Sequence, residues 1–414
     1  MTHSPNPTSA ELREALHKCE GRYLTDAEGA IAEVHKVLSC ARSSGDSALI
    51  AMCLMELGRA HRQQPDLLKA GDYFREALGM FTSLGDGQGI PLALQGLGTV
   101  HSASGNLPEA VRCFNGALPL AQSNQDWYTV QRIFNSWGIV SIRSGDYAGA
   151  MHTFGECLAS LADHPDEYLE SSVLANIGAI FERSEEYETA AEHFERSLAI
   201  ARRLQDDRQV TSTLVFLANT RLHENRLEEA RICIEEALQL STKHNLQDLK
   251  SQILISLAEL TLLGSTPGDA LRYLTEAREL VEATPNKIHL QKVEHAIGAT
   301  YLQLGDLEKA EIALGRALEL AERVASPQLL YETNLLYSEI ATKQLDYKRA
   351  NEYLHAALKQ HELLHSETNR QAVRALEVRM ALNTYRRRRD ARNQETNELT
   401  AAVAETQTES SQAQ

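Results

Sequence analysis

Small and apolar residues recur along the chain at a fixed step of 40 residues. Nine alanines mark the step, and each is followed four residues later by a larger apolar side chain. In most units a small residue follows seven residues after the alanine. Residues four and seven apart lie on one face of an α-helix, so the pattern predicts a helix around each alanine. The nine are Ala30, Ala70, Ala110, Ala150, Ala190, Ala230, Ala270, Ala310 and Ala350.

A second set of small residues stands twelve positions before the alanines, and each follows a large apolar residue. Turn-forming pairs such as Gly105-Asn106 and Gly145-Asp146 lie between the two sets. The pattern therefore predicts that each unit folds as a helix, a tight turn and a second helix. A small residue lets the two helices approach closely, whereas a bulky one would separate them. The set is Gly58, Gly98, Gly138, Gly178, Ala218, Ala258, Gly298 and Ser338.

Recurring aspartates mark the joints between the repeat units. Aspartates recur every 40 residues, a few positions before each first helix, where an acid is expected to cap the helix. The recurrence ends at Leu246, so the later units have diverged. The aspartates are Asp46, Asp86, Asp126, Asp166 and Asp206.

This pattern resembles the tetratricopeptide repeat, with its L-G-x2-Y and A-x3-F-x2-A motifs. Leu97-Gly98 with Ala110, Phe114 and Ala117 carries the resemblance most fully. The period departs from the usual 34 residues of that family, and 40-residue repeats of this type resemble those of bacterial signalling and regulatory arrays. The resemblance implies an all-α fold, a right-handed superhelical solenoid of antiparallel helix pairs followed by a long C-terminal helix.

The chain divides by composition and phase into four parts. We expect a disordered N-terminus over 1–12, about nine repeats over 13–364, a long C-terminal helix over 365–399 and a disordered tail over 400–414. The C-terminal helix resembles the linkers that follow such repeats in bacterial sensors, and it is a candidate coiled coil. The alternative is a polar cap that shields the last repeat.

Charge and cysteine usage restrict the classes of function. The formal net charge of −16 disfavours nucleic acid as a partner, since phosphate binding needs basic surface. The first residues contain no apolar core of a secretory signal, and no apolar run is long enough to cross a bilayer. None of the six cysteines forms a C-x-x-C pair. We therefore expect a cytoplasmic protein with no membrane partner.

Enzyme motifs are absent from the sequence. It has no phosphate-binding GxxxxGK[ST] loop, no GxGxxG on a strand and no HExxH. We expect no catalytic residue, no cofactor and no metal, and we keep an enzyme only as a third class of function because fold does not fix activity.

The resemblance implies a concave groove lined by the first helix of each repeat. In three consecutive repeats this face carries asparagines and arginines. Asparagine amides pair with a peptide backbone, and arginines pair with acidic side chains or a terminal carboxylate. The alternative is that the asparagines bond to neighbouring backbone or face water. The candidate peptide- or partner-binding residues are Arg132, Asn135, Arg143, Asn176, Arg183 and Asn219.

Two functions follow from this interpretation. The first is a protein–protein interaction scaffold that binds a peptide or partner helix in the groove. The alternative is a bacterial regulatory protein that senses a peptide or partner and relays the state through its C-terminal helix. In either case the expected partner is a protein or peptide, and a homodimer through the C-terminal helix is a further expectation.

Overall fold

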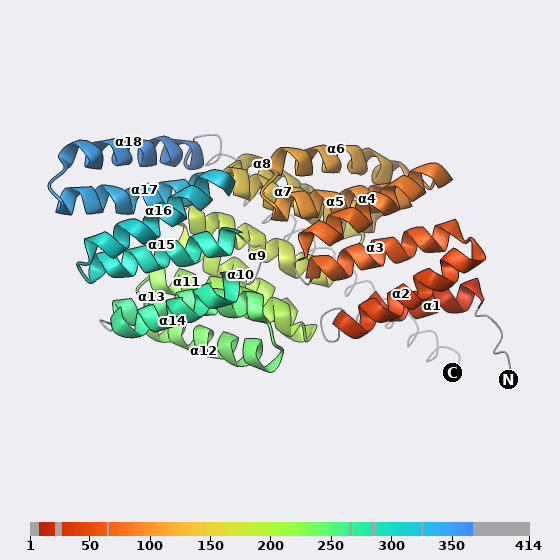
Figure 1. Ribbon diagram of the computed structural model, residues 1–414, viewed down its shortest axis with the longest axis horizontal. Helices are drawn as coiled ribbons and strands as arrows, with labels where there is room; N and C mark the ends of the chain where they lie inside the picture. The colour runs from red at the N-terminus through yellow and green to blue at the C-terminus, as the bar shows by residue number, and fades with distance from the viewer. Residues whose placement is uncertain are drawn as a thin grey trace, which may run out of the picture.

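The computed structural model describes residues 8–20, 27–63, 66–264, 267–282, 287–324 and 326–366. These residues form an all-α chain of 18 helices (Figure 1). The helices are α1 (Ser9–Glu20), α2 (Ala27–Ser44), α3 (Ser47–Gln63), α4 (Leu67–Leu84), α5 (Gly89–Ala103), α6 (Leu107–Ser123), α7 (Trp127–Ser144), α8 (Tyr147–Asp163), α9 (Glu167–Arg183), α10 (Tyr187–Arg203), α11 (Asp207–His223), α12 (Leu227–Lys243), α13 (Gln247–Leu263), α14 (Pro267–Glu282), α15 (Lys287–Gln303), α16 (Leu307–Val324), α17 (Pro327–Lys343) and α18 (Tyr347–Leu364). No helix in these ranges is long and apolar enough to cross a membrane.

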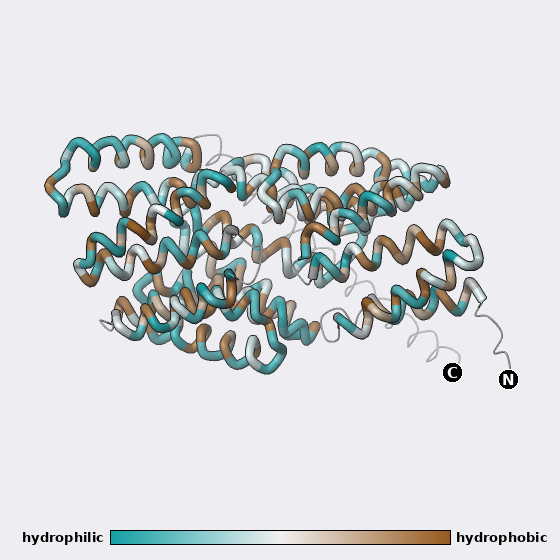
Figure 2. Tube along the Cα trace, viewed as in Figure 1, coloured by the Kyte–Doolittle hydropathy of each residue, from teal (hydrophilic) through white to brown (hydrophobic). Residues whose placement is uncertain are grey.

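The helices form nine pairs, and each pair contains one of the nine marker alanines in its second helix. The odd-numbered helix of each pair is its first helix, and consecutive pairs stack along the array. Hydrophobic positions recur along every helix and meet between the pairs (Figure 2). The predicted all-α solenoid of paired helices is confirmed.

Where the small residue of the first helix is glycine, the large side chain of the second helix packs directly against it. A Cβ atom at Gly98 would lie 2.3 Å from the ring of Phe114, and one at Gly138 would lie 2.4 Å from the ring of Phe154. Both rings are fully buried. The predicted close approach is therefore a contact between an aromatic ring and the glycine backbone. Any side chain at the glycine would collide with the ring.

The same turn joins helices within a repeat and between repeats. In the middle of the array, 17-residue helices alternate with short turns, as in α9, α10, α11 and α12. Most of the described turns hold one residue at positive φ, always at a position that is a multiple of 20 plus 5, as at Gly105, Gln125 and Gly145. The turn before α9 is an exception, because Pro165 stands at that position. The next residue returns its N–H to the carbonyl five positions back, as Asp126 does to Ala121 at 3.0 Å. A 20-residue half-unit therefore underlies the 40-residue period.

The recurring aspartates cap the first helices as expected. Asp126, Asp166 and Asp206 each accept a hydrogen bond from the backbone N–H three residues on. Leu246 and Ser326 occupy the same place without a side-chain cap. The array begins earlier than the predicted residue 13, because Thr8 and Glu11 form reciprocal hydrogen bonds that start α1. Residues 367–414, which hold most of the predicted C-terminal helix and all of the tail, lie outside the described residues.

The array curves until its end meets its middle. In Figure 1 the ends of α17 and α18 point toward α7 and α8, and α17 contacts α7. A Cβ atom at Gly145, in the turn after α7, would lie 3.2 Å from Leu364 Cδ2 and 3.2 Å from Pro327 Cγ. Leu364 and the adjoining Tyr147 are almost fully buried in one core cluster. We call this contact of Gly145 and Tyr147 with Pro327 and Leu364 the closure contact.

Candidate functional site

The first helices of the repeats carry the polar side chains of the concave side. Their charged groups interact electrostatically between non-adjacent repeats. The charges of Glu182 on α9, Arg143 on α7 and Glu332 on α17 all affect the pKa of Lys292 on α15. We call the space enclosed by α7, α9, α11, α13, α15 and α17 the lumen. Because α17 contacts α7, the first helices from α7 to α17 form a ring, and the predicted groove lies on the inner side of that ring.

A cavity of about 370 Å³ lies at the N-terminal end of the lumen. Residues from α3, α5, α7 and α9 line it, and we call it the arginine cavity because Arg62, Arg132 and Arg143 all contribute to its wall. Asn135 lines the same cavity, beside Gln95 and Ser136. Three of the six predicted residues, Arg132, Asn135 and Arg143, are thus brought together.

Asn176 joins this group through a side-chain contact. Its Nδ2 donates a hydrogen bond to Oδ1 of Asn135 at 3.0 Å, from α9 to α7. Within the described residues, the amide nitrogen of Asn135 and the amide oxygen of Asn176 make no further hydrogen bond. One donor and one acceptor are therefore available side by side, which is the complement of a peptide unit.

The asparagine contact also belongs to a structural series. Gln95 of α5 bonds to Ser136 of α7 at 3.1 Å, one repeat earlier and at matching positions. Further along, Ser256 donates to Oδ1 of Asn219 at 2.6 Å. One atom of each asparagine is therefore hydrogen-bonded to a side chain of the next repeat or the previous one, rather than to the neighbouring backbone that the alternative expected.

The remaining predicted residues lie outside the arginine cavity. Asn219 is on α11, next to α13, and Arg183 donates to the carbonyl of Ala179 in its own helix at 3.4 Å. Arg143 does line the cavity, but its guanidinium is held by the carbonyl and hydroxyl oxygens of Ser102, at 2.6 and 3.2 Å. Burial and the nearby Arg183 lower the pKa of Arg143. The six residues are therefore not one site.

Sequence reasoning missed Arg62, the remaining arginine of the cavity. It follows Gly58 by four residues, a position that faces the groove in the family pattern, so the signal was present. Burial lowers the pKa of Arg62 to about 10, and the positive charges of Arg132, Arg59 and Arg208 add to the effect. Among the described residues, no carboxylate or hydrogen-bond acceptor contacts its guanidinium.

Two opposite charges face each other deeper in the lumen. Burial raises the pKa of Glu182 on α9 and lowers the pKa of Lys292 on α15. Each feels the charge of the other, but no ion pair joins them within the described part of the chain. Opposite charges therefore face the inner side of the ring from α9 and α15.

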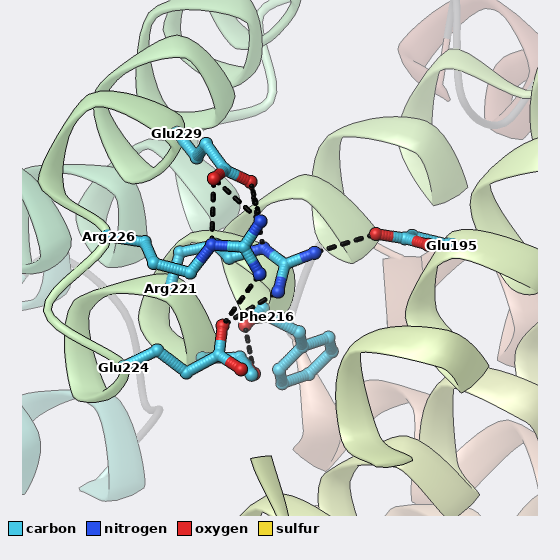
Figure 3. Close-up of polar contacts among 7 residues, drawn as sticks. Glu195, Phe216, Arg221, Glu224, Arg226 and Glu229 are labelled. Carbon is cyan, nitrogen blue, oxygen red and sulfur yellow. Dashed lines mark hydrogen bonds and ion pairs between the residues drawn. The ribbon is translucent and has the colours of Figure 1, made fainter. Parts of the chain in front are cut away.

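A different polar cluster joins the fifth and sixth repeats. Arg221 of α11 is only 7% exposed, and its guanidinium bonds to Glu195 of α10 and to Glu224, both at 2.7 Å. Its Nε lies 3.4 Å from Glu229, which Arg226 also binds through two nitrogens (Figure 3). We call this the arginine joint. Its guanidinium groups are fully matched by carboxylates, so it is a structural element.

One group has the residue types of a metal site. Ligand atoms of His101, Glu109 and Cys113 lie within 4.8 Å of one another. However, Arg112 is ion-paired with Glu109, and burial raises the pKa of the Cys113 thiol, which opposes the thiolate that a metal requires. This chemistry does not favour a metal.

Comparison with known proteins places these features in context. Family models of the tetratricopeptide repeat match residues 49–123, 169–243 and 295–323. No protein with a curated description matches the sequence.

Solved structures share the fold at low sequence identity. A Rap protein complexed with Competence and Sporulation Factor has a TM-score of 0.63 and 16% identity, over 86% of this chain and 99% of that chain. The apo quorum sensor NprR from B. thuringiensis has a TM-score of 0.55 and 18% identity, over 75% and 87% of the two chains. NprR in complex with its cognate peptide NprX has a TM-score of 0.56 and 16% identity, over 76% and 89%.

Proposed function

Because the chain is a tetratricopeptide-repeat protein, we propose that it binds a peptide or a partner helix in the lumen formed by its first helices. The observation that carries the proposal is the pairing of Asn135 with Asn176 beside the arginine cavity. The pair leaves one donor and one acceptor available in an enclosed, half-buried place. A peptide backbone supplies the matching acceptor and donor.

The similar structures support the same class of ligand. NprR was solved in complex with its cognate peptide NprX, and the Rap protein was solved in complex with Competence and Sporulation Factor. The proposal describes a binding protein rather than an enzyme, located in the cytoplasm, with no nucleic-acid or membrane partner.

A regulatory role is the second candidate, and the closure contact favours it. Leu364 is the last residue of α18 and packs against the turn after α7, next to the lumen. Residues 367–414 follow directly. A ligand bound in the lumen would therefore act on this end of α18, and a second copy bound through residues 367–414 would receive the signal.

Affinity capture from the host's lysate tests both candidates. The baits are the wild type, a triple variant Asn135→Ala, Asn176→Ala and Asn219→Ala, and a chain truncated after Ser366. Asn115→Ala is the matched control, because Asn115 is exposed on the second helix α6. Peptides and proteins are identified separately by mass spectrometry, and circular dichroism verifies that each bait is helical.

We expect a ligand that the control retains and the triple variant loses. A ligand lost only on truncation would contradict binding in the lumen and place the function in residues 367–414. For the regulatory role, the truncated chain must keep the ligand but lose a protein partner.

A further inference from the structure

We propose that the exposed face of α18 is the interface through which two copies of this chain form a two-fold symmetric dimer. Tyr347, Leu354 and Leu358 lie on this face, and Leu345 in the turn before α18 adjoins it. We call these four residues the end patch. The patch lies on a second helix rather than on the first helices that form the lumen, and it includes no residue of 367–414.

Leu354 departs from the burial pattern of the array. It stands four residues after the marker alanine Ala350 and is 41% exposed, whereas the residue at this position is 0–2% exposed in each earlier repeat. Every second helix from α2 to α16 packs against the first helix that follows it, but no described helix follows α18 at the end of the array (Figure 1). The face of α18 is therefore apolar where its equivalents are covered. The buried equivalents are Val34, Phe74, Phe114, Phe154, Phe194, Ile234, Leu274 and Leu314.

The other two helical residues of the end patch show the same contrast. Tyr347 is 66% exposed, whereas Tyr147 is buried at the matching position of the fourth repeat. Leu358 is 48% exposed, whereas Leu198 is buried at the matching position of the fifth. Single exposed apolar residues are ordinary, but several on one face mark an interaction surface.

Leu345 extends the patch at a cost to its own backbone. Its φ of 62° lies in the left-handed region, which a bulky residue disfavours. The other described turns within repeats place glycine or a polar residue there. Because Leu345 is 72% exposed, it gains little burial within its own chain to offset this cost. A second molecule that covers it would supply that burial. The other turn residues are Gly105, Gly145, Glu185, Asn225 and Gly305.

The chain leaves α18 differently from the way it enters most first helices. At five described joints into a first helix, the residue before the cap position has positive φ. His365, at the matching position after α18, has a φ of −104°. Pro165, before α9, is the exception among the earlier joints that the structure describes. This departure favours a second molecule, rather than residues 367–414, as the cover of α18. The five are Gly45, Gly85, Gln125, Gln205 and Asn245.

The charges of α18 match a second copy of the same helix. Its exposed residues include Lys348 and Lys359 against Glu352 and Glu362, so the face attracts neither a strongly basic nor a strongly acidic partner. Lys348 and Glu362 lie near opposite ends of the helix, about 21 Å apart at 1.5 Å per residue. When two copies of α18 pack antiparallel, each Lys348 comes beside Glu362 of the partner subunit, and the leucines between them meet.

Sedimentation velocity of the full-length chain over a concentration series tests the dimer. The buffer contains about 0.15 M salt, which screens the repulsion between two chains of net charge −16 beyond about 8 Å. We expect the wild type to reach twice the mass of one chain. Leu358→Glu places a charge in the apolar contact and should raise the dissociation constant about tenfold or more. Ile232→Glu is the control, because Ile232 is equally apolar and exposed on α12.

Exchange of the two end charges tests the antiparallel alignment. Lys348→Glu and Glu362→Lys should each weaken the dimer about threefold, because each brings like charges together across the interface. The double variant Lys348→Glu with Glu362→Lys should recover the wild-type affinity. A mixture of the two single variants should form the mixed dimer in preference to either homodimer. The two positions are too far apart on one helix for this recovery to arise within one chain.

The outcomes that contradict the dimer are distinct from those that contradict ligand binding. A wild type that stays a single chain at every concentration would overturn the interface. A dimer that Leu358→Glu leaves intact would place the contact elsewhere and also overturn it. Charge variants whose losses add in the double variant would overturn the antiparallel alignment. Circular dichroism verifies the fold of each variant, and the asparagine variants test the lumen separately.

Discussion

The arginine joint and the arginine cavity place the same residue type in opposite situations. Arg221 is almost fully buried and contacts Glu195, Glu224 and Glu229. Arg62 lines the cavity together with Arg132 and Arg143, and among the described residues it has no carboxylate partner. The paired charges of the joint hold two repeats together, whereas the charge of Arg62 in the cavity forms no such pair within the described residues. The difference indicates which arginine belongs to the architecture and which is available for a ligand.

The largest expected effect is at the joint. Arg221→Met would remove the buried cation that Glu195, Glu224 and Glu229 share and would leave Arg226 to pair with Glu224 and Glu229. Because two of these carboxylates are half exposed, we expect the free energy of unfolding to fall by about 3 kcal/mol, the lower end for a broken buried pair. Urea denaturation followed by circular dichroism measures it. Arg231→Met is the control, since Arg231 pairs with exposed Glu228 and Glu235, and its loss should cost less than about 1 kcal/mol. Equal losses in the two variants would show that the joint is not structural.

The next effect is acid sensitivity beside the joint. His193 of α10 stacks on Phe181 with ring centroids 5.2 Å apart, and its Nδ1 has no hydrogen-bond partner among the described residues. Burial and the nearby Arg196 lower its pKa to about 4. In the unfolded chain its pKa is about 6.5, so the unfolded state binds the proton more readily. The stability that neutral His193 contributes is present above pH 6.5 and is lost as the pH falls toward 4.

His193→Phe isolates this effect. The ring stays, but it no longer takes up a proton, so the variant should lose less stability on acidification than the wild type does. The difference between the two chains should approach about 3 kcal/mol at pH 4, and urea midpoints across the pH range measure it. Parallel pH profiles would mean that His193 is protonated at no cost in the folded chain.

The smallest effect has the opposite sign and lies in the cavity. Arg62→Met removes an enclosed charge with no carboxylate partner among the described residues, and we expect the chain to become more stable by about 1 kcal/mol. The same denaturation assay measures the gain. A loss of stability instead would show that Arg62 is part of the architecture, and the contrast with Arg221 would then fail.

Much of the fold can be predicted from residues that lie close together in the sequence. The 40-residue alanines and the small residues twelve positions before them predict the helix pairs, because Gly98 and Phe114 meet within one unit. The turns follow local rules as well, although the residues at positive φ include Gln125 and Leu345, which have no glycine to mark them. The closure contact could not be predicted in this way. It brings Gly145 and Leu364 together from different units, and it depends on the accumulated curvature of all the repeats between them.

The candidate site was predictable only in part. Family position identified Asn135 and Asn176 but not that they would bond to each other, since this depends on the offset between α7 and α9. Arg62 occupies a groove-facing position, but its lack of a carboxylate partner depends on which side chains curvature brings opposite it. Arg143 seemed free in the sequence, whereas the turn of the superhelix places it against Ser102.

The closure contact also changes how the array should fold. In an open solenoid each repeat contacts only its neighbours, so the terminal repeat frays first and unfolding spreads one unit at a time. Here the last pair is packed against the middle of the array, and it cannot detach without breaking a second interface. Closing so long a stretch of chain raises the contact order and slows folding. In return, repeats four to nine should unfold as one cooperative block, with hydrogen-exchange protection that does not decline toward α18.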